Sequence, residues 1–228
     1  MRHVTRVARA LAICHLVGGL VLAAPLSARA ASTLGLDFVG TTENAFSAEL
    51  TLGWSFSVNQ PIAVTGLGFF DDALSPFGSL GLKQDHLISL WTAGGALLAQ
   101  TTITNASTPV ASTAADGRWL FNDIAAVTLA PGTYVIGALN SASLACATCD
   151  YFRYLDTATT SSAITFIEAR DISGNAFPSN PIPSRNDGYF GPDFAFTPVP
   201  EPMTMLLGGT GLLALGYVGR KRLFRSES

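Results

Sequence analysis

The segment Ser47–Val58 reads Ser-Ala-Glu-Leu-Thr-Leu-Gly-Trp-Ser-Phe-Ser-Val and alternates apolar with small or polar side chains. The apolar positions are Leu50, Leu52, Trp54, Phe56 and Val58, and the intervening hydroxyl residues are Thr51, Ser55 and Ser57. Because successive side chains of a strand point to opposite faces, a period of two indicates a β-strand with one buried face. We therefore expect a half-buried strand here.

Similar patterns recur on both sides of this segment, separated by turn residues such as Asn59-Gln60-Pro61, Ala93-Gly94-Gly95 and Ala130-Pro131-Gly132. We expect strands at 34–39, 62–70, 86–91, 97–103, 119–124, 127–129, 133–139, 163–169 and 189–196. Many short strands with regular turns are typical of a two-sheet fold. The sequence predicts an all-β protein, an antiparallel β-sandwich of jelly-roll-like type, flanked by an N-terminal signal helix and a C-terminal transmembrane helix.

Charge is divided unevenly along the 228 residues. Residues 31–198 hold five of the 13 basic residues and 14 of the 16 acidic ones, which gives this body a net charge of −9. Such a body should repel nucleic-acid phosphates, so we expect no nucleic-acid partner. Solubility or cation binding is the better explanation for the acidic excess.

The first 30 residues have the pattern of a secretory signal peptide. Three arginines lie before Ala10, an apolar run extends from Ala10 to Ala24, and Ala28-Arg29-Ala30 supplies small residues for signal peptidase. We expect cleavage before Ala31. The alternative is an uncleaved anchor helix, although this run is short for a bilayer.

The last 30 residues contain three ordered parts. Pro200-Glu201-Pro202 favours an extended backbone, since prolines flank the acidic residue. The apolar run Met203–Val218 would span about 24 Å as a helix, and a basic cluster follows it. That cluster consists of Arg220, Lys221, Arg222 and Arg225. By the positive-inside rule it holds the C-terminus in the cytoplasm, so the body faces outward.

This tail, residues 199–225, closely resembles the PEP-CTERM sorting signal of certain Gram-negative bacteria. The resemblance implies that an exosortase, a membrane-embedded cysteine protease-transpeptidase, recognises Pro200, Glu201 and Pro202 and removes the helix. A permanent single-pass anchor is the alternative. The expected domains are a signal peptide (1–30), an ectodomain (31–198) and a sorting signal (199–228), and the expected route leads from the inner membrane to the cell surface or the medium.

A second resemblance covers roughly residues 50–140. Thr65-Gly66-Leu67-Gly68-Phe69-Phe70-Asp71, His86–Trp91 and Leu129–Ile136 look like parts of a family of secreted β-sandwich domains of unknown function that recur in PEP-CTERM proteins. The resemblance implies a fold and carries no activity.

Two groups of residues in the body have chemistry to consider. Asp71, Asp72 and Asp85, with the neighbouring His86, could offer oxygen ligands to Ca²⁺ if their loop folds back, although no EF-hand pattern is present. A solvated loop is the simpler interpretation, and we expect no cofactor. Cys146 and Cys149 lie in a loop of an exported body, which favours a local disulfide over a redox centre or a zinc site.

No nucleophile motif is visible, so we expect a non-enzymatic envelope or extracellular-matrix protein. A carbohydrate-binding module is the alternative, with Trp91 and Tyr151 as stacking residues and extracellular polysaccharide as the partner; a polysaccharide hydrolase is a third hypothesis. Trp91 and Trp119 are otherwise expected in the core. Signal peptidase and exosortase are the partners expected during export.

Overall fold

The structure is a computed structural model that describes residues 32–40, 43–46, 48–73, 79–141, 149–154, 157–182 and 188–199. The chain divides into two units between Ala30 and Ala31, and every described residue belongs to the second unit. The predicted signal helix, with Ala28, Ala30 and Ala31, and the predicted tail from Pro200 onward lie outside the described residues. Within the described part, no helix is long and apolar enough to cross a membrane.

The described part is all-β, and every strand pair is antiparallel. One sheet has the order β1 (Thr33–Leu34), β15 (Pro192–Pro198), β5 (Ile62–Asp72), β9 (Gly117–Leu129) and β8 (Thr108–Ala111). The other has the order β14 (Asn180–Pro181), β13 (Ile164–Ser173), β4 (Leu50–Val58), β10 (Gly132–Asn140), β6 (His86–Thr92) and β7 (Leu97–Ile103). Two smaller pairs join β3 (Glu43–Ala45) to β11 (Tyr151–Arg153) and β2 (Leu36–Val39) to β12 (Thr157–Thr160).

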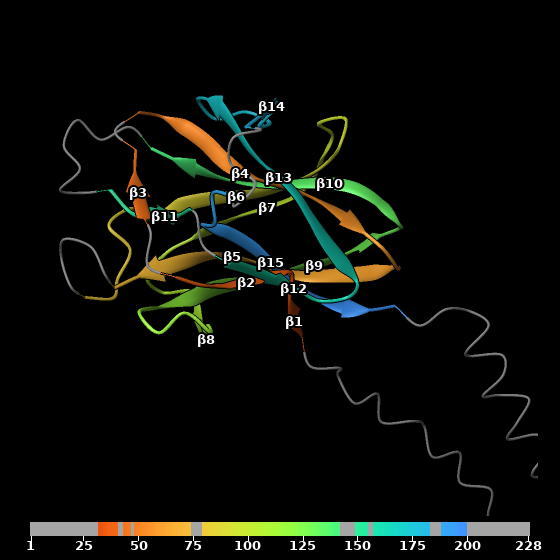
Figure 1. Cartoon of the computed structure of the whole chain (residues 1–228), viewed down its shortest axis with the longest axis horizontal. Coiled ribbons are helices and arrows are strands. Elements are labelled where there is room, and N and C mark those ends of the chain that lie inside the picture. Colours follow the sequence, from red (N-terminus) through yellow and green to blue (C-terminus); the bar gives the residue numbers. More distant parts are fainter. Residues whose placement is uncertain are drawn as a thin grey trace, which may run out of the picture. The chain divides into compact units, whose positions relative to one another are not determined.

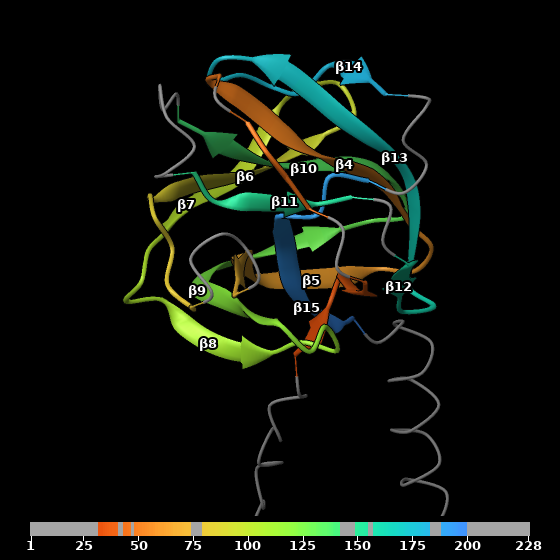
Figure 2. The ribbon, with the colours of Figure 1, turned by 60° about the vertical axis from the view of Figure 1, so that its left-hand side comes forward.

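Side chains from both large sheets meet in one aromatic core. Phe56 of β4 and Phe194 of β15 stack with ring centroids 4.6 Å apart, and Trp54 stacks on Phe194 at 5.8 Å. The indole N–H of Trp54 also donates to the carbonyl of Pro192 across the core (2.9 Å). The β4–β10 layer lies over the β5–β15 layer in Figure 1, and the same two layers are visible after rotation in Figure 2.

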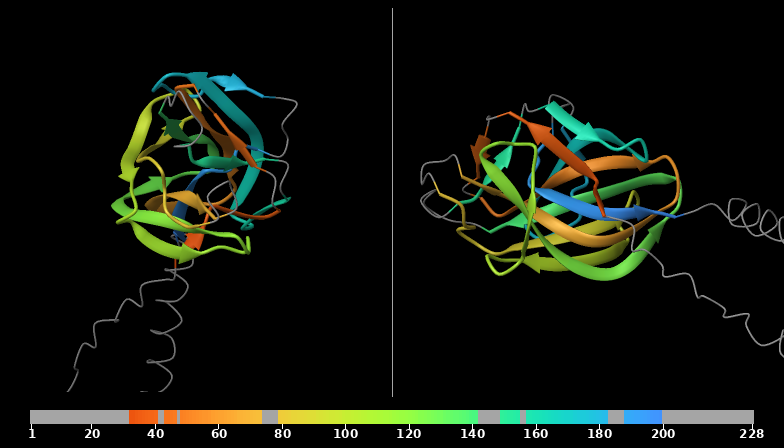
Figure 3. Two further views of the ribbon diagram at one scale, coloured as in Figure 1. Left: turned by 90° about the vertical axis from the view of Figure 1, so that its left-hand side faces the viewer. Right: turned by 90° about the horizontal axis from the view of Figure 1, so that it is seen from below.

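The two sheets curve around this core, as Figure 3 shows. They are linked at one side by Asn122 of β9, whose amide donates to the carbonyl of Thr102 in β7 (2.8 Å). On the other side, β2 inserts the fully buried Leu36 and Phe38 into the core and pairs with β12. Terminal residues of the domain are therefore part of its core packing.

Most predicted strands are confirmed, with some boundaries corrected. The segments predicted at 119–124 and 127–129 form the single strand β9, and a register shift in its pairing with β5 lies between Val64 and Gly66. The strand predicted at 34–39 is split at Gly35 into β1 and β2, which pair with different partners. The last strand begins at Pro192, although Phe190 makes an isolated bridge to Arg153.

The prediction that β4 is half-buried is wrong. Thr51 and Ser55 on its outer face are only 2% and 1% exposed. The reason is that β4 lies inside the sheet and the chain after β13 packs against it, since the Thr51 hydroxyl donates to the carbonyl of Gly174 (2.7 Å). Both faces of this strand are buried.

The predicted corner at Ala93-Gly94-Gly95 is confirmed as the turn between β6 and β7. The backbone N–H of Gly95 donates to the carbonyl of Thr92 (3.0 Å), and Gly95 has a φ of 86°. A residue with a side chain rarely adopts this left-handed conformation, which explains the glycine.

Candidate functional site

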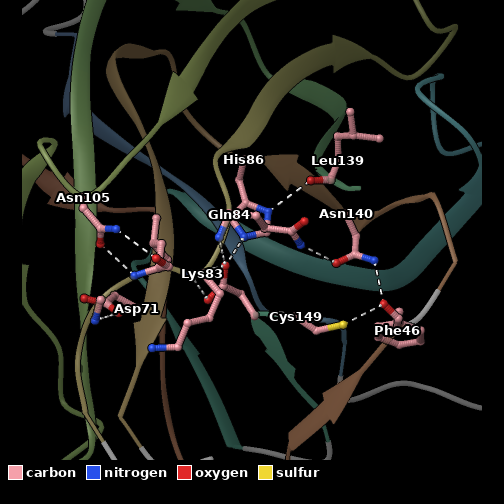
Figure 4. A network of polar contacts seen from close by, with 12 residues as sticks. Phe46, Asp71, Lys83, Gln84, His86, Asn105, Leu139, Asn140 and Cys149 are labelled. Atoms are coloured by element: carbon pink, nitrogen blue, oxygen red, sulfur yellow. Dashed lines mark hydrogen bonds and ion pairs between the residues drawn. The ribbon is translucent and has the colours of Figure 1, made fainter. Parts of the chain in front are cut away.

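Polar residues gather where β5 ends and β6 begins. Their centre is His86, the first residue of β6, whose side chain is fully buried. Its Nδ1 lies 3.0 Å from the carbonyl oxygen of Leu139, and its Nε2 lies 3.0 Å from Oδ2 of Asp150. The ring also stacks on Phe69, with centroids 3.7 Å apart. Figure 4 shows the ring directed at the carbonyl of Leu139.

The hydrogen-bond partners of His86 determine what its ring can do. A carbonyl oxygen only accepts, so Nδ1 must carry a hydrogen. Nε2 of His86 faces the Asp150 carboxylate. Both ring nitrogens are therefore engaged within the protein, and neither is directed at an external group.

Asp150 fixes the loop that precedes β6. Its carboxylate accepts from the backbone N–H of Lys83 (2.8 Å and 3.0 Å) and from that of Gln84 (3.0 Å), in addition to its contact with His86. Charge-assisted hydrogen bonds of this kind are stronger than neutral ones. The carboxylate thus ties the residues before β11 to the start of β6.

An amide chain extends the network toward β4. The Gln84 amide donates to Oδ1 of Asn140 (2.9 Å), and the Asn140 amide donates to the carbonyls of Phe46 and Ala48 (2.9 Å each). The buried Cys149 lies 3.5 Å from the same Phe46 carbonyl through its Sγ (Figure 4). Cys146 lies outside the described residues, so the disulfide with Cys149 stays a prediction.

Asp71 and Asp72 are each neutralised by a different arginine. Asp71 accepts from the Gly81 backbone N–H (2.7 Å) and pairs with Nε of Arg118 (2.9 Å). Asp72 pairs with Nε of Arg153 (2.8 Å). Asp85 is exposed. The three carboxylates considered as Ca²⁺ ligands are therefore not assembled, and among the residues described there is no group of three metal-ligating side chains.

Arg153 is the most deeply buried cation of the described part, with a side-chain exposure of 0%. Besides Asp72, its guanidinium pairs with Asp116 (2.9 Å) and donates to the carbonyl of Gly40 (2.9 Å). Its Cζ lies 5.4 Å from the ring centroid of Phe70, within cation–π range. Arg153 thus holds three chain segments together.

The proposed stacking residues do not form an exposed platform. Trp91 is only 7% exposed and packs edge-on against Phe177 (5.9 Å), in agreement with its expected place among the buried residues. Trp119 and Phe152 are also buried, whereas Tyr151 and Tyr154 are half-buried.

Asp193 of β15 is a further buried acidic residue, and like Asp150 it was not singled out by the sequence. Its Oδ1 accepts from the Leu36 backbone N–H (3.0 Å), while its Oδ2 is buried with no hydrogen-bond partner. Burial raises the pKa of Asp193 well above its ordinary value, and the negative charge of Asp37 adds to this, whereas the backbone N–H groups of Phe194 and Leu36 lower it. The folded state therefore favours the protonated carboxyl.

We expect Asp193→Asn to stabilise the protein at pH 7, because asparagine keeps an acceptor for Leu36 and carries no charge. Since the folded pKa is raised, the folded state retains a proton that the unfolded state has lost, and wild-type stability falls as pH rises above the unfolded pKa of about 4. The gain in unfolding free energy, measured by urea denaturation, should be small at pH 4 and larger at pH 7. A gain that is independent of pH would contradict the assignment.

Comparison with known proteins places the domain in a family. Residues 37–190 match the model described as Domain of unknown function (DUF4082), which covers more than half of the chain. The chain belongs to the DUF4082 family. No curated protein and no solved structure matches it. The polar network around His86 lies within the DUF4082 match, whereas β1 and β15 lie outside it although both belong to the five-stranded sheet.

Proposed function

We propose that this chain is exported across a bacterial inner membrane, held by its C-terminal apolar segment, and cut by an exosortase at Pro200-Glu201-Pro202. The released or attached product is a non-enzymatic, jelly-roll-like β-sandwich at the cell surface or in the extracellular matrix. The observation that carries this proposal is the order of Pro-Glu-Pro, an apolar run and a basic cluster directly after the last strand, which ends at Pro198.

The extent of the fold supports the proposal. The described strands run from Thr33 to Pro198. They lie in the sequence between the two terminal segments that resemble targeting signals. Every strand of the described part would therefore be retained after removal of both ends.

The chemistry of the buried residues supports a non-enzymatic body. Both nitrogens of His86 are engaged, and the two carboxylates at the end of β5 are paired with arginines. A general base needs a free position toward its substrate, and a catalytic carboxylate pair needs two groups that face a common ligand. No specific observation favours the carbohydrate-binding alternative, since Trp91 is buried.

The proposal is tested by replacing the recognition segment in the native host. Pro200→Ala/Glu201→Ala/Pro202→Ala should leave the chain uncut and retained in the membrane fraction, because the exosortase loses its substrate. The matched control Ser226→Ala/Glu227→Ala/Ser228→Ala also removes one glutamate but leaves the motif intact, and it should be processed like the wild type. Immunoblotting of membrane, surface and medium fractions measures both. Normal processing of the first variant would refute exosortase sorting.

A further inference from the structure

One end of the domain is made of turns that lack charged residues. It consists of Asn59–Pro61, Ala93–Ala96, Ala130–Pro131 and Ser161–Ala163, together with Val199 after the last strand. We call this the uncharged end. The strand register places these turns together, since Val58 pairs with both Gly132 and Ile164, and Ile62 pairs with both Leu129 and Pro198.

Hydrogen bonds connect the turns of the uncharged end. The Asn59 N–H donates to the carbonyl of Ala163 (2.8 Å), and the Val199 N–H donates to the carbonyl of Pro61 (3.0 Å). Gln60, Ala93 and Ala130 are exposed. This end is therefore a solvent-accessible surface held by the strands behind it.

Charged side chains of the described part lie away from this end. The positions nearest in register are Asp37, Glu168 and Asp123. Asp37 pairs with Thr159, two residues before Ser161, and its carboxylate accepts from the Ser112 hydroxyl (2.6 Å) and the Trp119 indole (3.1 Å). Glu168 pairs in register with Ser55, and Asp123 pairs with Gly66. Glu168 is three residues from the end of β4 and is itself neutralised by Arg170 (2.7 Å). Three strand residues correspond to about 10 Å. The acidic residues of the described part are thus either engaged by other side chains, as Asp37 and Glu168 are, or lie further along the strands from the uncharged end.

The sequence places an apolar segment immediately beyond this end. Only Pro200, Glu201 and Pro202 separate Val199, the last described residue, from the apolar run that starts at Met203. Four residue steps reach at most about 14 Å when fully extended. If the apolar run is in a bilayer, the uncharged end must lie close to the lipid headgroups.

We propose that the uncharged end is the surface that faces and contacts the phospholipid headgroups while the C-terminal segment is in the membrane. Anionic headgroups would repel a body with a net charge of −9 if its acidic residues faced them. The observed distribution avoids this repulsion and leaves uncharged Asn, Gln, Ser, Gly and Pro residues at the lipid surface. This inference rests on the proposed membrane insertion of the tail.

The test uses the full chain reconstituted in vesicles of phosphatidylethanolamine and phosphatidylglycerol that contain a lipid with a photoreactive headgroup. Mass spectrometry of the crosslinked peptides should find several-fold more lipid on turns 59–61, 93–96 and 130–131 than on Leu80–Asp85 and Ala114–Asp116, which lie at the opposite end of β5 and β9. Labelled lipid on the tail shows that the tail is inserted. A labelled tail with unlabelled turns would overturn this inference alone, whereas an unlabelled tail would overturn the proposed insertion and this inference together.

A charge variant provides the second arm of the test. Gln60→Glu/Ala93→Glu/Ala130→Glu should reduce lipid labelling of the turns at low salt, and high salt should restore it, because screening removes the repulsion. The matched control Leu80→Glu/Ala115→Glu/Asn175→Glu adds the same charge at exposed positions far from the uncharged end and should change nothing. Equal effects of the two variants would contradict the proposed orientation.

Discussion

Replacing Arg153 by methionine is expected to lower the free energy of unfolding by about 3–5 kcal/mol, because removing one partner of a buried ion pair leaves an uncompensated charge. Here two carboxylates, Asp72 and Asp116, would lose the same guanidinium. The loss is a large part of the stability of a typical domain, about 5–15 kcal/mol. Chemical denaturation followed by tryptophan fluorescence measures it.

Two controls identify the cause of this loss. Arg170→Met removes a more exposed pair with Glu168 and should cost about 1 kcal/mol or less. Adding Asp72→Asn and Asp116→Asn to Arg153→Met should recover part of the stability, since the stranded charges are then gone. If Arg153→Met proved no more destabilising than Arg170→Met, the buried cluster would not have the role assigned to it.

A fragment limited to residues 37–190, the segment matched by the family model, is expected not to fold. It lacks β15, which lies between β1 and β5, and with it the buried Phe194 and Phe196. Loss of a buried phenylalanine side chain costs about 3–5 kcal/mol, so losing two of them exceeds the stability of many domains. Near-ultraviolet circular dichroism and a denaturation curve report the result.

The control for this fragment is residues 32–199, which keeps every described strand. It should give a fixed aromatic signal and one cooperative transition. A cooperative transition of the 37–190 fragment with the same midpoint as 32–199 would show that β1 and β15 are dispensable, contrary to the packing of Phe194 on Phe56 and Trp54.

Period-two patterns were enough to find the long strands. Strands β4, β5, β6 and β10 each combine apolar alternation with a turn signal at one end, so local sequence defines them. The short strands β3, β8, β12 and β14 are not predicted by the sequence, because each holds at most four residues of pattern. Strands β3 and β12 also depend on partners that are distant in sequence. The burial of both faces of β4 also depends on a distant segment, that around Gly174.

The polar site was only partly visible in the sequence. Asp71, Asp72 and His86 were singled out by residue type, but their partners Arg118, Arg153 and Asp150 lie 47, 81 and 64 residues away. No local pattern connects such positions. The composition carries one signal. A buried carboxylate needs a charged or hydrogen-bonded partner, and the body offers only five basic residues as cationic partners.

We propose that both ends of the chain are targeting signals that are removed, and that the strands between them form the mature protein. The most direct test is the intact mass of the protein isolated from its native host, with the fraction of origin recorded. We predict a mass that begins at Ala31 and ends between Pro200 and Pro202, from the cell surface or the medium, with or without an added group. A membrane-bound protein whose mass still includes Met203–Ser228 would contradict exosortase processing and leave a permanently anchored domain.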